Sequence, residues 1–144
     1  MNKLFFSLIA LVSLVAISCG TPESNTNNPS DQTAEQPSTV KNVQVADLKE
    51  ALNATEDIVV LDVRTAGEVA QGYVNSALNV DVNGANFSQG VQELDTSKTI
   101  YVYCRSGQRS QKASTQLLEL GFTDVRNVEG GFMAWEQAGY PIVK

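Results

Sequence analysis

Histidine is absent from the 144-residue chain, which has only two cysteines. Without an imidazole base, neither a Ser-His-Asp triad nor a Cys-His pair can form. Two cysteines are too few for a tetrahedral zinc shell of the Cys/His type, and they allow one disulfide bridge at most. The sequence therefore excludes these hydrolase sites and disulfide-rich scaffolds, and we expect neither a metal nor a cofactor.

Basic residues are also scarce, because 10 Lys and Arg stand against 16 Asp and Glu, a formal net charge of −6. Nucleic-acid binding relies on Lys and Arg to neutralise phosphates, so we expect no nucleic-acid partner. The length predicts a single folded domain.

The start of the chain has the pattern of an export signal. Lys3 supplies a positive charge, and residues 4–17 are apolar apart from two serines. This run is shorter than the roughly 20 residues that a helix needs to span a bilayer. A charged start, a short apolar core and small residues after it are typical of a secretory signal, predicted here over residues 1–18.

The signal ends in Ala16-Ile17-Ser18-Cys19-Gly20, which resembles the bacterial lipoprotein signal. The resemblance implies that Cys19 is lipidated, becomes the new N-terminus and anchors the exported protein to a membrane of the bacterial cell envelope, on the periplasmic or outer surface. Ala16 departs from the Leu that this family prefers. Ordinary signal cleavage nearby, with Cys19 left as a free thiol, is the alternative.

The composition changes abruptly after the signal. Residues 21–40 contain three of the four prolines and otherwise mostly Ser, Thr, Asn, Gln and acidic residues. Such a segment cannot bury enough apolar surface to offset its ordering entropy. We predict that residues 19–40 comprise the lipid-anchored cysteine and a disordered linker, either a tether or a spacer without a selected length. Residues 41–144 then form the folded domain.

Strand and helix patterns alternate along this domain. Alternating or continuous β-branched runs predict strands at 43–45, 58–63, 78–82, 99–103 and 125–128. Helical spacing predicts helices at 47–52, from the capping box Thr65-Ala66-Gly67-Glu68, at 87–94, at 111–120 and at 132–138. In the helix at 111–120, Ala113, Leu117 and Leu120 share the buried face. The predicted fold is α/β, with a mostly parallel central sheet flanked by helices on both faces.

One strand-to-helix junction holds the candidate chemistry. The strand at 99–103 runs into Cys104-Arg105-Ser106-Gly107-Gln108-Arg109-Ser110. Ligands of parallel sheets bind beyond the carboxyl ends of strands, where loop N–H groups and a helix dipole form an anion-binding nest. Gly107 permits the positive φ that such a loop often needs. We expect this field to lower the pKa of Cys104, whose alternative role is a small buried apolar residue.

The segment around Cys104 is predicted to be cationic. No acid occurs between Asp95 and Glu119, and this interval carries Lys98, Arg105, Arg109 and Lys112. The two arginines can fork onto a sulfate-like or phosphate-like group. A small anionic substrate fits this charge.

Three motifs in order resemble the single-domain rhodanese family of sulfurtransferases. They are Asp62-Val63-Arg64-Thr65 with Glu68 and then Gly72-Tyr73-Val74-Asn75-Ser76-Ala77-Leu78-Asn79; the loop CRSGQRS; and Glu129-Gly130-Gly131-Phe132-Met133-Ala134-Trp135 with Gly139-Tyr140-Pro141. Tyr73 stands where the family usually has His, and Ser76 where it usually has Gly.

The resemblance implies the chemistry of the site. Cys104 is the catalytic nucleophile, which takes sulfur from a small anionic donor such as thiosulfate and passes it, as a persulfide, to cyanide or a thiol. The substrate-binding residues implied are Arg105, Ser106, Gly107, Gln108, Arg109 and Ser110.

The remaining motif residues are expected to play structural or supporting roles. Asp62 and Arg64 either support the loop or form a structural ion pair, which we favour. Glu68 completes the capping box. The pair Gly130-Gly131 permits a tight turn near the loop, and Phe132 and Trp135 belong to the core.

The sequence leaves three other functions to compare with sulfur transfer. A cysteine phosphatase uses a C-x5-R loop, whereas Arg109 gives C-x4-R here, a smaller ring that suits sulfane sulfur better. Arsenate reduction would need a further thiol. A carrier or partner-binding module that holds sulfur without turnover is the alternative from a different class.

Overall fold

Strand β4 (Thr99–Tyr103) lies in the middle of a five-stranded parallel sheet. The strand order is β1-β5-β4-β2-β3, with β1 at Lys41–Val43, β5 at Asp124–Val128, β2 at Ile58–Asp62 and β3 at Leu78–Asn79. This computed structural model describes residues 39–54 and 57–144. The predicted signal, Cys19 and the linker up to residue 38 lie outside the described residues.

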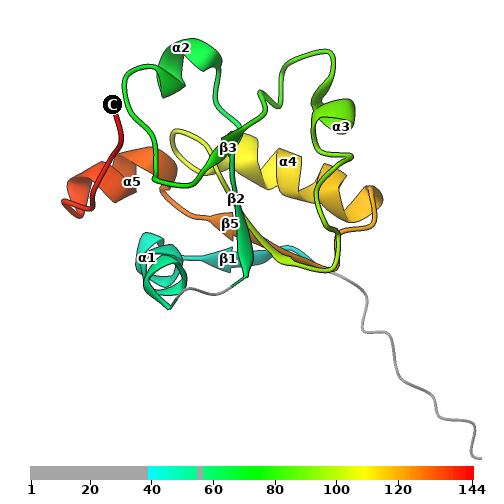
Figure 1. Cartoon of the computed structure of the whole chain (residues 1–144), viewed down its shortest axis with the longest axis horizontal. Helices are drawn as coiled ribbons and strands as arrows, with labels where there is room; N and C mark the ends of the chain where they lie inside the picture. Colours follow the sequence, from blue (N-terminus) through cyan, green and yellow to red (C-terminus); the bar gives the residue numbers. More distant parts are fainter. Residues whose placement is uncertain (1–38, 55–56) are drawn as a thin grey trace, which may run out of the picture. The chain divides into compact units, whose positions relative to one another are not determined.

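The two faces of the sheet pack against different helices. Ile100 and Val102 point to one face, which is covered by α3 (Phe87–Gly90) and α4 (Gln108–Glu119). Tyr101 and Tyr103 point to the other, covered by α1 (Val45–Asn53) and α5 (Gly131–Gln137). The short α2 (Ala66–Val69) follows β2. The predicted α/β fold, with a parallel sheet between helices, is confirmed (Figure 1).

Some element boundaries differ from the prediction. The sequence pattern predicts a strand at Val45, yet Val45 begins α1, because Gln44 and Asp47 form a capping box that starts the helix there. The strand predicted at 78–82 is only two residues long, although Val80 and Val82 still donate hydrogen bonds to carbonyls of β2 and the residue after it. Leu120 is the C-cap of α4 and is 39% exposed, so it does not share the buried face.

Within the described part of the chain, the helices are all too short or too polar to cross a bilayer.

Candidate active site

Cys104 occupies the carboxyl end of the central strand. It continues the alternation of Ile100 and Val102, so its side chain joins the same buried cluster, and the residue is only 1% exposed. Both interpretations of Cys104 from the sequence, a thiol facing an anion-binding loop and a small buried residue, therefore hold. Cys104 is buried like a core residue, and its sulfur also faces the polar loop that follows.

The loop is folded around the sulfur atom. The Gly107 N–H donates to Cys104 Sγ at 3.2 Å, and the Ser110 hydroxyl lies 3.6 Å from it. Gly107 has φ +98°, the left-handed conformation predicted from the sequence. Burial raises the pKa of the Cys104 thiol, but hydrogen bonds from Ser110, Ser106 and Gly107 together lower it by more than burial raises it. The net pKa lies below its ordinary value, as predicted, because the N–H groups stabilise the thiolate.

Helix α5 holds the outer side of the loop. The N–H groups of Phe132 and Met133 donate to the carbonyls of Cys104 and Arg105 at 2.8 and 3.0 Å. The approach is so close that a Cβ on Gly131 would collide with the Cys104 carbonyl oxygen. With the loop carbonyls turned outward to α5, the loop N–H groups are left facing the sulfur. The predicted tight turn at Gly130-Gly131 is confirmed, since both glycines have positive φ.

A buried amide that the sequence analysis missed fixes Ser110. The Ser110 hydroxyl lies 2.7 Å from Asn127 Oδ1, and Asn127 Nδ2 donates to Asn42 Oδ1 and Gln111 Oε1 at 3.0 and 2.9 Å. Asn127 is 4% exposed. The available signal was an amide two residues after the apolar Val125 of β5, which places it on the same face of the strand.

Arg109 pairs with a carboxylate of the protein itself, a partner that the sequence did not indicate. Arg109 Nη1 and Nη2 donate to the two carboxylate oxygens of Glu68 at 2.8 and 2.6 Å. The hydrogen bonds from this guanidinium are the largest cause that lowers the pKa of Glu68, to about 2; burial opposes the shift, and hydrogen bonds from Thr65 add to it. The capping box at Thr65 and Glu68 is confirmed as well. Glu68 therefore joins α2 to the first turn of α4 in addition to starting α2.

The cationic interval of the sequence does not form one surface. Lys98 lies before β4, at the opposite end from Cys104, and pairs with Asp57 at 2.7 Å. With Arg109 paired to Glu68, Arg105 is the loop cation that forms no ion pair within residues 39–54 and 57–144. The positive charge near the sulfur is smaller than the sequence indicated.

Asp62 and Arg64 form a buried ion pair, the arrangement favoured from the sequence. Arg64 Nη2 lies 2.6 Å from Asp62 Oδ2, and it also donates to the Gly72 carbonyl at 2.8 Å. The side chains are 3% and 1% exposed. The Arg64 guanidinium also lies 4.0 Å from the centre of the Phe132 ring. The pair joins β2, the segment at Gly72 and α5.

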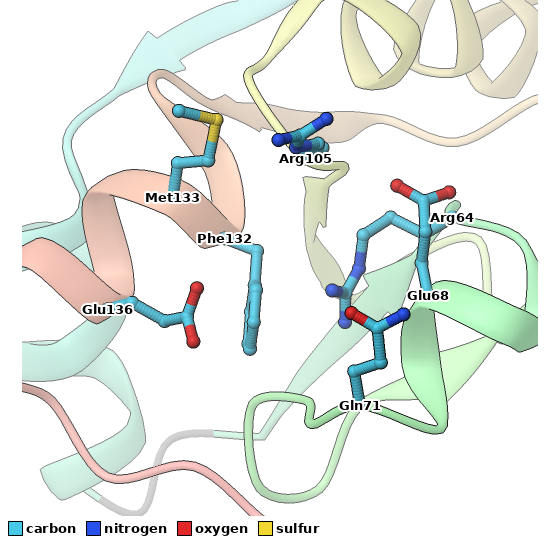
Figure 2. Close-up of a pocket in the computed structure, with 7 residues that line it drawn as sticks. All are labelled: Arg64, Glu68, Gln71, Arg105, Phe132, Met133 and Glu136. Atoms are coloured by element: carbon cyan, nitrogen blue, oxygen red, sulfur yellow. The ribbon is translucent and has the colours of Figure 1, made fainter.

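A pocket of about 430 Å³ opens beside the loop (Figure 2). Phe132 and Met133 of α5 form an apolar part of its wall, and the Arg64 guanidinium lies beside the Phe132 ring. The lining residues are Arg64, Glu68, Gln71, Arg105, Phe132, Met133 and Glu136. Phe132 and Trp135 are buried, as expected of core residues, and Phe132 also lines this pocket. The pocket combines cations, carboxylates and apolar surface.

The two departures from the rhodanese pattern lie away from the sulfur. Tyr73 exchanges both backbone hydrogen bonds with Val143, which attaches the C-terminal segment. Ser76 has φ +65°, a conformation that favours the glycine usual in the family. Neither residue contacts Cys104 through a hydrogen bond in the described structure.

A cysteine at the carboxyl end of a parallel strand, enclosed by inward-facing N–H groups, defines a protein built to stabilise a thiolate. The chain belongs to the rhodanese-like domain family, whose model matches residues 44–138.

Relatives of known name support this assignment. A sulfurtransferase of Allochromatium vinosum is 35% identical over 72% of this chain and 95% of its own length. A putative sulfurtransferase, YtwF, of Bacillus subtilis is 39% identical over 67% of this chain and 91% of its own. The crystal structure of a rhodanese-related protein from Thermoplasma volcanium is 33% identical, with a TM-score of 0.63 over 72% of this chain and 97% of that one. These similarities support sulfurtransferase activity in general.

Proposed function

We propose that the protein is a sulfurtransferase that carries sulfane sulfur on Cys104, from an anionic donor such as thiosulfate to cyanide or a thiol. The observation that carries this proposal is the loop around Cys104, in which the Gly107 N–H lies 3.2 Å from the sulfur. The hydrogen bonds that lower the pKa of Cys104 favour the nucleophilic thiolate without an imidazole base.

The first half-reaction forms a persulfide. The Cys104 thiolate attacks the outer sulfur of thiosulfate, the S–S bond of the donor breaks, and sulfite leaves with the electron pair. The negative charge passes from the thiolate to the outer sulfur of the new persulfide. The N–H groups of the loop stabilise this charge, and Arg105 at the pocket provides a cation for the sulfonate.

The second half-reaction returns the enzyme to its starting state. An acceptor nucleophile, cyanide or a thiolate, attacks the terminal sulfur of the persulfide, and Cys104 leaves as a thiolate. Because one covalent intermediate links two half-reactions, donor and acceptor should follow ping-pong kinetics.

Mass spectrometry of the intact protein tests the intermediate. After thiosulfate treatment, the wild-type protein should gain the mass of one sulfur atom, and cyanide should remove it with release of thiocyanate. Cys104→Ser should show neither event. Transfer that survives in this variant would refute the role of Cys104.

The same assay, run beside a measurement of aryl phosphate hydrolysis, separates the alternatives. A carrier without turnover would gain the sulfur but release no thiocyanate. A phosphatase would hydrolyse an aryl phosphate and ignore thiosulfate. The loop of four residues between Cys104 and Arg109 supports the sulfurtransferase, because it encloses a smaller space than the phosphatase loop of five.

We also propose that the protein is exported and held at the bacterial cell envelope by lipid on Cys19. The support is the sequence alone, a short apolar segment that ends at Cys19. Cells fed radiolabelled fatty acid should label the wild-type protein and should not label Cys19→Ala. Equal labelling of both would exclude Cys19 as the lipid site.

A further inference from the structure

The anion-binding edge of Arg109 is already occupied by a carboxylate of the protein itself. Both terminal nitrogens of Arg109 donate to Glu68, at 2.8 and 2.6 Å. Bidentate pairing through Nη1 and Nη2 occupies the end-on fork of N–H groups, which is one of the edges that can bind a sulfonate. An anionic reagent can therefore bind this edge only in place of Glu68.

The position of the pair places this competition at the reaction centre. Glu68 lines the pocket beside the loop (Figure 2). The hydrogen bond to Glu68 is the largest cause that raises the pKa of Arg109. Burial lowers this pKa, and the nearby Cys104 raises it as well. Cys104 itself is 1% exposed, so a reagent must move a neighbouring group to reach the sulfur.

The pair can open more easily than the other ion pair near the pocket. The side chains of Arg109 and Glu68 are 29% and 28% exposed, whereas those of Arg64 and Asp62 are 3% and 1% exposed. Water compensates the separated charges of a partly exposed pair, but a buried pair has no such compensation. Glu68 and Arg109 are therefore the charges that an incoming anion can rearrange.

We propose that Glu68 is a specificity-determining residue, an internal competitor that the anionic group of the sulfur donor displaces from Arg109 on its way to Cys104. The identity of the donor rests on the function proposed above, whereas the competition between Glu68 and an external anion does not. A neutral reagent gains nothing from Arg109, while an anion replaces the carboxylate of Glu68. Glu68 therefore weakens the capture of all anions and favours those whose charge is concentrated enough to displace it.

Alkylation of Cys104 in the full-length protein measures this competition directly. Iodoacetate and iodoacetamide both alkylate a thiolate with loss of iodide, and they differ mainly in that iodoacetate is an anion. The rate for each is followed by mass spectrometry of the peptide that contains Cys104. The ratio of the two rates cancels any change in the pKa or general accessibility of the thiol.

Glu68→Gln is the informative variant, because Gln also completes a capping box with Thr65 and preserves the start of α2. We expect it to raise the iodoacetate-to-iodoacetamide ratio about fivefold, the effect of weakening a partly exposed ion pair. Glu136→Gln removes a negative charge from the same pocket without touching Arg109, and should change the ratio less than twofold.

A double-mutant cycle assigns the effect to Arg109. In an Arg109→Gln background, Glu68→Gln should no longer change the ratio. An unchanged ratio in Glu68→Gln, or an equal increase without Arg109, would overturn the proposal.

The proposal and the function can fail separately. Alkylation needs no sulfur transfer, so the ratio is measurable even if thiosulfate gives no turnover. Where turnover occurs, Glu68→Gln should lower KM for thiosulfate and leave kcat unchanged. A normal KM in a variant with a raised alkylation ratio would show that thiosulfate does not use Arg109, and would overturn the assignment to the donor.

Discussion

Ser76 is the non-glycine residue with a positive φ among residues 39–54 and 57–144, at +65°. An L-residue in the left-handed region places its Cβ near the following carbonyl, which costs about 1–2 kcal/mol. Glycine avoids this contact but loses more conformational freedom on folding. At Ser76 the relief of strain should outweigh the loss of entropy, because the side chain is exposed and forms no compensating hydrogen bond with residues 39–54 or 57–144.

The first prediction follows at this residue. Ser76→Gly should raise the free energy of unfolding by about 0.5–1 kcal/mol, measured by urea denaturation. Asn75→Gly, beside it but without a positive φ, should lower stability by a similar amount. A loss of stability in Ser76→Gly would show that its backbone is not strained.

The residue scale also shows what the sequence could and could not predict about the site. Cys104 and Gly107 were identifiable because their roles depend on neighbours within one loop. The partner of Arg109 was not, because Glu68 lies 41 positions away and only the fold brings them together. Asn127 was missed for the same reason, since its contacts come from β1 and α4.

At the scale of elements, the conformation of the loop that begins at Cys104 depends on α5, the helix that follows β5. The N-terminal N–H groups of α5 bind the carbonyls of Cys104 and Arg105, and Gly131 allows this approach. A methyl group on Gly131 would also lie 2.8 Å from the carbonyl carbon of Arg105. The backbone atoms of the loop cannot yield as a flexible side chain could.

The second prediction tests this contact. Gly131→Ala should lower the free energy of unfolding by about 2–4 kcal/mol, through its positive φ and the collision with the loop, and it should raise the pKa of Cys104 as the loop N–H groups shift. Gly139→Ala is the matched control, because Gly139 also has positive φ but no atom lies within 4 Å of the added Cβ. It should cost about 1 kcal/mol and leave the thiol unchanged. Equal costs in the two variants would mean that α5 does not press on the loop.

Element types were predictable where local signals agreed. Strand β4 was predicted with its observed bounds, and the capping box at Thr65 placed the start of α2. The prediction failed at Val45, where apolar alternation suggested a strand but the cap at Gln44 begins a helix. It also failed at β3, whose length is set by pairing to β2 at the sheet edge rather than by its own residues.

At the scale of the folded domain, acid should destabilise the protein through two carboxylates. Arg109 holds the pKa of Glu68 at about 2 instead of 4.5. Burial raises the pKa of Asp124, but hydrogen bonds from Arg126, Lys41 and Thr99 together outweigh this effect and bring the pKa below its ordinary range. A carboxylate whose pKa is lowered on folding stabilises the fold at pH values above its unfolded pKa. This contribution is lost as the pH falls from the unfolded pKa to the folded pKa.

The third prediction is therefore a decline in the free energy of unfolding between about pH 5 and pH 2, measured by urea denaturation at fixed ionic strength. Glu68→Gln should flatten part of the decline and Asp124→Asn another part. A free energy that is constant across this interval would show that neither carboxylate gains from its ion pairs.

The contact between the loop and α5 also has a consequence in time. The loop is synthesised before the N–H groups that fix its peptide planes, which belong to residues 132 and 133. Until those residues have been synthesised and have docked, Cys104 lacks the constraint that turns the loop N–H groups toward its sulfur. The loop geometry that lowers the pKa of the thiol is therefore complete only after α5 has been synthesised and has docked on the loop.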